Sequence, residues 1–144
     1  MWINFANYED LDLIVDMEKQ CFEDKAWNRQ MIESDFEKRS NYVICYTNDD
    51  EPIGYLAFLD LDTECEILRI GVRKQFRKQG NARAMLEFLF DYCIDNNKEK
   101  IFLEVSSLNH VAINLYKKVG FNLINTRKNY YGPGEDALNY VKLL

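Results

Sequence analysis

Residues 64–105 constrain the fold more than any other segment, because they combine two strand patterns with a helical pattern between them. Residues 64–72 are strand-like and contain an internal glycine, Gly71. After a basic turn, apolar residues recur at helical spacing over residues 82–93, and residues 101–105 form a run typical of a buried strand. A strand, a helix and a strand in this order predict a parallel pair joined by a crossover helix.

The sequence before this unit predicts two helices and a hairpin. One helix begins at residues 7–10, where acidic side chains favour a helix N-terminus, and a second begins near Asn28. Strand-like runs at residues 42–46 and 52–59, separated by a turn at 48–51, predict an antiparallel hairpin.

The sequence after this unit predicts one more helix and two more strands. The helix begins at Asn109 or His110 and ends near Gly120, and the strands follow at residues 121–127 and 138–143. We therefore expect one domain over residues 1–144, of the α/β (α+β) class. It should have a mixed, mostly antiparallel sheet with helices on both faces.

The charge of the chain limits its partners. It has 24 acidic and 18 basic residues and a net charge of −6, which argues against coating of duplex nucleic acid. A basic peptide or a cationic amine fits this charge better, and solubility alone explains it equally well. No apolar run approaches membrane-spanning length and no secretion signal follows Met1, so we expect no membrane partner and a cytoplasmic protein.

The cysteines do not suggest a metal site. They are widely spaced, form no C-x-x-C pair and are accompanied by a single histidine, His110. We expect no bound metal, and thiols that are reduced and mostly buried. The four are Cys21, Cys45, Cys65 and Cys93.

Three local patterns are candidates for chemistry. The turn at residues 77–83 precedes a helix, whose N-terminus would bind phosphate, although a solvated basic loop explains the same spacing equally well. Glu104 interrupts an apolar strand and is a candidate base, unless it simply reaches solvent at the strand end. Tyr116 lies two helical turns after Asn109 and is a candidate proton donor, or a core tyrosine.

Together these residues resemble a known family. Ile70-Gly71-Val72 followed by Arg77-x-x-Gly80-x-Ala82 is similar to the acetyl-CoA signature of the GNAT N-acetyltransferases, and the order of elements is similar across nearly the whole chain. The RimI type of this family is resembled by several further segments. They are Leu103-Glu104-Val105, Asn109, Ala112-x-x-Leu115-Tyr116, Gly120-Phe121, the tail 127–131 and Glu135-Asp136-Ala137.

The resemblance implies a ternary-complex acetyltransferase that uses acetyl-CoA as co-substrate. Glu104 would be the base and Tyr116 the acid, and Gly71 would form the bulge that splays the central parallel strands. The N–H of Val72 would steady the thioester oxyanion. The residues implied in cofactor binding are Ile70, Gly71, Val72, Arg77, Lys78, Gln79, Gly80, Asn81, Ala82, Arg83 and Asn109.

The acceptor implied by the RimI type is the N-terminal alanine of a ribosomal protein. Trp27 and a loop around Tyr130 and Tyr131 would bind it, and Glu135 and Asp136 would attract a basic tail. Two departures affect peptide specificity. Ala26-Trp27-Asn28 stands where this type usually has a Pro-Trp-Ser-like stretch, and Asn81 replaces a small or apolar residue. Transfer to a small amine or to lysine, or a non-catalytic acyl-CoA-binding subunit, are the alternatives.

Overall fold

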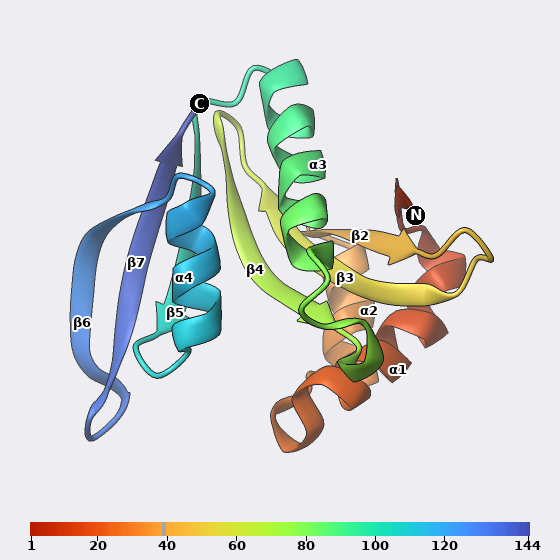
Figure 1. The fold of residues 1–144 in the computed structure, drawn as a ribbon, viewed down its shortest axis with the longest axis horizontal. Helices are drawn as coiled ribbons and strands as arrows, with labels where there is room; N and C mark the ends of the chain where they lie inside the picture. The colour runs from red at the N-terminus through yellow and green to blue at the C-terminus, as the bar shows by residue number, and fades with distance from the viewer. Residues whose placement is uncertain (39) are drawn as a thin grey trace.

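The computed structural model describes residues 1–38 and 40–144, and within them one sheet has the strand order β1-β2-β3-β4-β5-β7-β6 (Figure 1). The strands are β1 (Trp2–Phe5), β2 (Ser40–Tyr46), β3 (Pro52–Asp60), β4 (Glu64–Val72), β5 (Lys100–Ser106), β6 (Asn122–Gly132) and β7 (Glu135–Leu143). The α-helices are α1 (Leu11–Phe22), α2 (Arg29–Phe36), α3 (Asn81–Asp95) and α4 (His110–Lys118). Short 3-10 turns are η1 (Tyr8–Asp10), η2 (Glu23–Lys25) and η3 (Lys74–Phe76).

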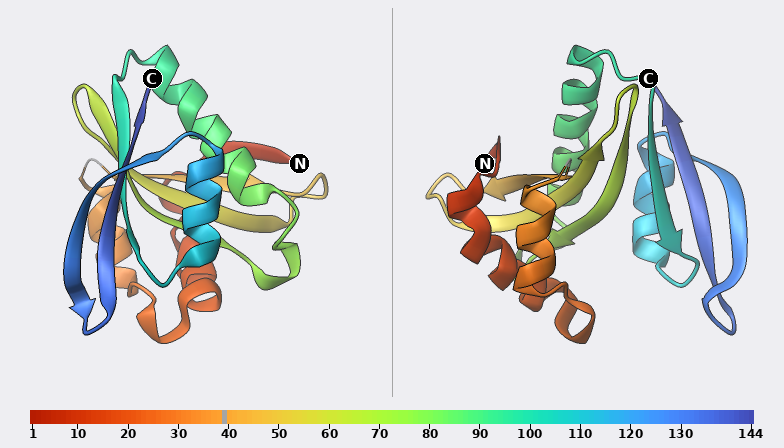
Figure 2. Two further views of the ribbon diagram at one scale, coloured as in Figure 1. Left: turned by 60° about the vertical axis from the view of Figure 1, so that its left-hand side comes forward. Right: turned by 180° about the vertical axis from the view of Figure 1, so that it is seen from behind.

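The helices cover the two faces of the sheet in pairs (Figure 2). One apolar cluster joins α1 and α2 to β2 and β3, and its members include Ile14, Met17, Ile32, Ile44 and Tyr55. A larger cluster on the other face joins α3 and α4 to β4 and β5, and its members include Met85, Leu89, Leu103, Ile113 and Tyr116. The expected arrangement, with helices on both faces, is confirmed.

The central strands β4 and β5 pair over only part of their length. They run parallel, and residues 64–67 of β4 pair with residues 100–103 of β5. Beyond these residues the two strands diverge (Figure 1). The predicted parallel pair and the predicted crossover are thus both present, and the pair opens toward its C-terminal end.

A bulge lies where the opening begins. On β3, Ala57 is opposite Arg69 but its neighbour Phe58 is opposite Ile67, so Leu68 is an extra residue on β4. The expectation that Gly71 forms this bulge is wrong. Gly71 is regularly paired and lies three residues later, because the bulge depends on an inserted residue and not on a glycine.

The extra residue changes which side chains of β4 face each layer. Before the bulge, Cys65 and Ile67 pack against α3; after it, Ile70 and Val72 do so. The alternation is therefore shifted by one residue. As a result, both Glu66 before the bulge and Arg69 after it belong to the face that α1 and α2 cover.

Three features of the fold differ from the sequence-based expectation. The short edge strand β1 was not predicted, and it pairs with β2 over residues 2–5. Strand β6 continues to Gly132, so Tyr130 and Tyr131 lie in a strand rather than in a loop. The register of β6 with β7 shifts between Arg127 and Gly132, so these tyrosines lie in an irregular stretch.

Two glycines allow close packing between β3, β4 and α1. A Cβ on Gly54 would lie 2.3 Å from the carbonyl oxygen of Gly71, which is a backbone atom. A Cβ on Gly71 would lie 2.9 Å from the Tyr55 ring and 3.2 Å from Cys21 Sγ, which are side-chain atoms. Side chains adjust more readily than a paired backbone.

We therefore expect Gly54→Ala to destabilise the protein more than Gly71→Ala. Overpacking by one methyl group at Gly71 should cost about 1–3 kcal/mol, and at Gly54 more than that. Urea unfolding of the wild type and both variants measures this difference. A Gly71→Ala variant that is the less stable of the two would contradict the prediction.

Candidate active site

The first part of the site is the edge of β4 beyond the bulge. Arg77 Nε donates to the carbonyl of Val72 over 2.8 Å, so this carbonyl points away from β3. The N–H of Val72 and the main-chain groups of Ile70 point to the same side. The carbonyl of Gly71 points toward β3, as its closeness to Gly54 shows. Ile70 and Val72, and not Gly71, therefore present main-chain groups to the opening.

The second part is the N-terminus of α3. Gly80 precedes it with a φ of 80°, and a Cβ there would meet no heavy atom within 4 Å. No side chain caps α3, whereas Asn28 caps α2 and Asn109 caps α4. The first N–H groups of α3, at residues 81–83, have no partner within the helix. This open, uncapped and positively polarised turn fits a phosphate group.

Most side chains of this turn are used within the protein. Buried Asn81 donates from Nδ2 to the carbonyl of Phe76 over 2.9 Å, and Gln79 donates to the carbonyl of Gln75 over 3.2 Å. Arg83 Nε pairs with Glu87 over 3.0 Å, and Arg77 is bound to Val72 as described. A ligand here would therefore meet mainly main-chain N–H groups, together with exposed Lys78, which has a φ of 61°.

Helix α4 supplies Tyr116 and Asn109. Tyr116 is buried among apolar neighbours, including Phe121 at a ring distance of 5.7 Å, and burial raises its pKa to about 12. The Tyr116 hydroxyl makes no hydrogen bond within the described residues. Every fully buried polar side-chain atom there has a partner, so this hydroxyl keeps some exposure to solvent. Asn109 Oδ1 accepts from the N–H of Ala112 over 3.2 Å, which leaves its Nδ2 as the group that could reach a ligand.

Glu104 lies on the opposite face of β5 from Tyr116. Leu103 and Val105 pack into the cluster with α3 and α4, and the strand alternates, so Glu104 points the other way. Arg127 Nε lies 3.2 Å from Glu104 Oε2, and the Tyr131 hydroxyl donates to Oε1 over 3.3 Å. Two side chains of β6 therefore orient this carboxylate. Because Glu104 and Tyr116 lie on opposite faces of the sheet, they can act on one substrate only where β4 and β5 diverge.

Glu66 is a second carboxylate on the face of Glu104, and the sequence analysis did not single it out. Burial raises its pKa, and the charges of Glu104 and Glu64 raise it further. A hollow of about 310 Å³ lies on this face between β4, β5, β6 and β7, and Glu64, Glu66 and Arg127 are among its lining residues. The one available signal was that Glu64 and Glu66 alternate with apolar residues at the start of a central strand.

The residues expected to bind the acceptor fall into two groups. Trp27 lies in the connection between α1 and α2, where its ring packs against the Arg69 guanidinium at 4.2 Å. Tyr130 and Tyr131 lie on β6, where Tyr130 packs against the Arg127 guanidinium at 4.4 Å and Tyr131 reaches Glu104. Within the described residues, no ring contact joins Trp27 to either tyrosine.

Two acidic residues expected to attract a basic tail have structural partners. Glu135 accepts a hydrogen bond from the Ser106 hydroxyl over 2.6 Å, and Asp136 accepts one from the N–H of Asn129 over 2.9 Å. The first contact joins the start of β7 to the end of β5, and the second joins it to β6. Over residues 1–38 and 40–144 there is no cluster of metal-ligating side chains, and no helix there could cross a membrane.

Comparison with known proteins identifies the family to which this fold and site belong. The model of the acetyltransferase (GNAT) family matches residues 11–121. The chain is a member of the GNAT family. The match extends from the start of α1 to Phe121, so it includes the β4–β5 opening, the α3 N-terminus, Glu104 and Tyr116.

Individual proteins of this family are similar over most of the chain. A [ribosomal protein bS18]-alanine N-acetyltransferase of Haemophilus ducreyi is 35% identical over 97 residues, covering 65% of this chain and 67% of that protein. A Bacillus subtilis protein provisionally named for the same activity is 27% identical and covers 90% of this chain and 87% of its own length. The Escherichia coli ribosomal-protein-S18-alanine N-acetyltransferase structure has a TM-score of 0.90 at 25% identity, covering 99% of this chain and 92% of that one. The expected resemblance to the RimI type is confirmed.

The raised pKa of Glu66 predicts a pH-dependent effect of removing its charge. Because its folded pKa exceeds the usual carboxyl value, the stability it contributes is present at low pH and is lost as the pH rises through the folded pKa. We therefore expect Glu66→Gln to unfold at a higher temperature than wild type at pH about 7, and to lose this advantage near pH about 4.

Thermal unfolding at the two pH values measures the effect. Glu64→Gln is the comparison variant, because it removes a charge that repels Glu66 but also the carboxylate that lies 4.0 Å from Lys100, so it should gain less than Glu66→Gln at neutral pH. A Glu66→Gln variant that is no more stable than wild type at neutral pH would contradict the prediction.

Proposed function

We propose that this GNAT protein transfers the acetyl group of acetyl-CoA to the N-terminal α-amino group of a protein, by direct attack in a ternary complex. The acceptor is the N-terminal alanine of a ribosomal protein in the cytoplasm, with no nucleic acid or membrane as partner. The observation that carries this proposal is that Glu104 and Tyr116 lie on opposite faces of β5, the strand that separates from β4 beyond Ile67 and Leu103. The names of the relatives support the choice of acceptor.

The cofactor contacts that we propose use mainly backbone groups. Main-chain groups of Ile70 and Val72 would pair with the pantetheine arm, and the first N–H groups of α3, at residues 81–83, would hold the pyrophosphate. Bound acetyl-CoA supplies a thioester carbonyl carbon for attack. The N–H of Val72 would stabilise the developing oxyanion, and Asn109 Nδ2 would contact the arm near the thioester.

Glu104 and Tyr116 would divide the proton transfers between them. An α-amine has a pKa of about 8, so much of it is already neutral at cellular pH and the base supplies a modest factor. Glu104, oriented by Arg127 and Tyr131, would accept the proton of the attacking amine. Tyr116 would donate its proton to the departing thiolate, and its raised pKa keeps that proton in place at neutral pH.

An acceptor panel tests the proposed function. We expect thiol release from acetyl-CoA to be fastest with a peptide beginning with Ala, slower with Ser or Met, and slowest with an N-terminally blocked peptide containing lysine. Activity with spermidine but with no peptide would contradict a protein acceptor. Tight acetyl-CoA binding without transfer to any amine would instead indicate a non-catalytic subunit.

We expect Glu104→Gln to lower kcat by about tenfold or more, while the KM for acetyl-CoA stays within twofold, because glutamine keeps the shape but cannot accept the proton. Steady-state kinetics over pH values of roughly 6 to 9 measures both constants. Glu64→Gln is the matched control, since it removes a carboxylate from the same face at the far end of β4. Equal kcat for Glu104→Gln and wild type at every pH would remove Glu104 from the chemistry.

A further inference from the structure

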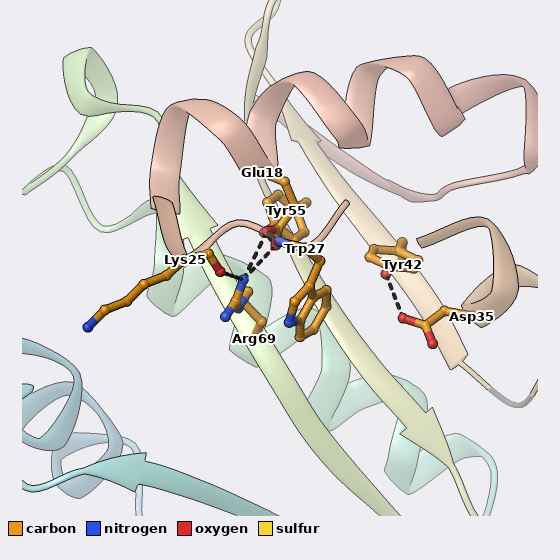
Figure 3. A network of polar contacts seen from close by, with 7 residues as sticks. All are labelled: Glu18, Lys25, Trp27, Asp35, Tyr42, Tyr55 and Arg69. Carbon is orange, nitrogen blue, oxygen red and sulfur yellow. Dashed lines mark hydrogen bonds and ion pairs between the residues drawn. The ribbon is translucent and has the colours of Figure 1, made fainter. Parts of the chain in front are cut away.

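A fully buried carboxylate lies in the layer of α1, on the face of the sheet to which Glu66 and Glu104 point. Glu18, on α1, is 0% exposed. Its Oε2 accepts from the N–H of Trp27 over 2.7 Å, and its Oε1 accepts from the hydroxyl of Tyr55 (Figure 3). Burying a charged carboxylate is costly unless a cation and hydrogen bonds compensate it, so this position needs a positively charged partner.

Arg69 is that partner, and several contacts fix the orientation of its guanidinium plane. Its Nη1 donates to both oxygens of Glu18, over 3.1 and 2.9 Å, and lies 3.5 Å from the carbonyl of Lys25. The guanidinium packs against the rings of Phe22 at 4.0 Å and Trp27 at 4.2 Å. Figure 3 shows Arg69 projecting from β4 toward Glu18, with the Trp27 ring beside it.

The rest of this guanidinium is available to a ligand. All of its hydrogen bonds within the described residues come from Nη1, so Nε and Nη2 keep their donors, and the side chain is 20% exposed. An arginine presents five donors in a fixed planar fork. The aromatic rings and Glu18 thus hold a donor edge in one orientation before any ligand arrives, which lowers the entropy cost of binding.

The place of Arg69 on the sheet relates this donor edge to the reacting centre. It is the first residue after the bulge and lies three residues before Val72, whose N–H we propose as the oxyanion donor. Three residues of strand span about 10 Å. An extended peptide covers this span with about three residues.

We propose that Arg69 is a specificity-determining residue that donates to a backbone carbonyl of the acceptor, two or three residues from its N-terminus, and that Glu18 positions it. This inference rests on the proposed function. A carbonyl fits better than an acidic side chain for two reasons. Glu18 already neutralises the guanidinium, and the carboxylates of Glu66 and Glu104 on the same face would repel an anion. The site therefore favours acceptors that are long enough to place a backbone carbonyl at Arg69, whatever the charge of their side chains.

The test compares Arg69→Lys with wild type on two acceptors, alaninamide and a tetrapeptide beginning with Ala. Lysine keeps a cation for Glu18 but loses the outer edge of the fork. We expect the ratio of kcat/KM for the tetrapeptide to that for alaninamide to fall about tenfold, as for one hydrogen bond to a charged group. The loss should appear in the KM of the tetrapeptide, with kcat and the KM for acetyl-CoA within twofold.

Arg29→Lys is the matched control, because Arg29 pairs with exposed Asp12 in the same helical layer and should leave the ratio at the wild-type value. The double variant Glu18→Gln with Arg69→Gln removes both charges together, leaves no unpaired buried charge, and should show the same fall if Arg69→Lys does not fold.

Three outcomes would overturn the inference. A wild-type ratio in a folded Arg69 variant would exclude the backbone contact and leave the proposed function intact. An equal loss on both acceptors would show that Arg69 has only a structural role. If the wild-type protein acetylates neither acceptor, the proposed function fails, and this inference fails with it.

Discussion

The single inserted residue at Leu68 is the constraint on which the rest of the structure depends. It coincides with the end of the β4–β5 pairing, so main-chain groups in the middle of a sheet are left without a strand partner. Such groups need hydrogen bonds from elsewhere, which an extended ligand arm can supply. The same opening is where the layer of Tyr116 meets the layer of Glu104. A continuous sheet would keep these two side chains apart.

The bulge also explains the buried charge in the layer of α1. Because the alternation of β4 shifts by one residue, Arg69 turns toward α1 and meets Glu18, where an unbroken strand would turn it toward α3. The pair is compensated by the rings of Phe22 and Trp27, which pack against the guanidinium, and by a main-chain N–H. The ordering of the α1–α2 connection, with Trp27 in it, therefore depends on the register of a strand far away in sequence.

Hydrophobic periodicity predicted the long helices and strands, but it could not predict the short edge strand or the position of the bulge. The crossover was predictable because residues 82–93 carry an unambiguous helical stripe. β1 was missed because it has only four residues and three of them are exposed, so it carries little burial pattern. The bulge was misplaced because Leu68 is an ordinary residue for a strand, whereas Gly71 stands out. Family resemblance identified Glu104 and Tyr116, whose roles stay predictions. It could not reveal the ion pair of Glu104 with Arg127, which depends on how β6 folds back.

The uncapped N-terminus of α3 affects how stable the protein is in a cell. Its unpaired N–H groups leave the free chain less stable than it would be with an anion in place. A ligand that binds only the folded state at a hundred times its Kd adds about 2.7 kcal/mol of stability. If acetyl-CoA is that ligand, the amount of folded enzyme rises and falls with the supply of its own acetyl donor, so a starved cell would hold a less durable population of it.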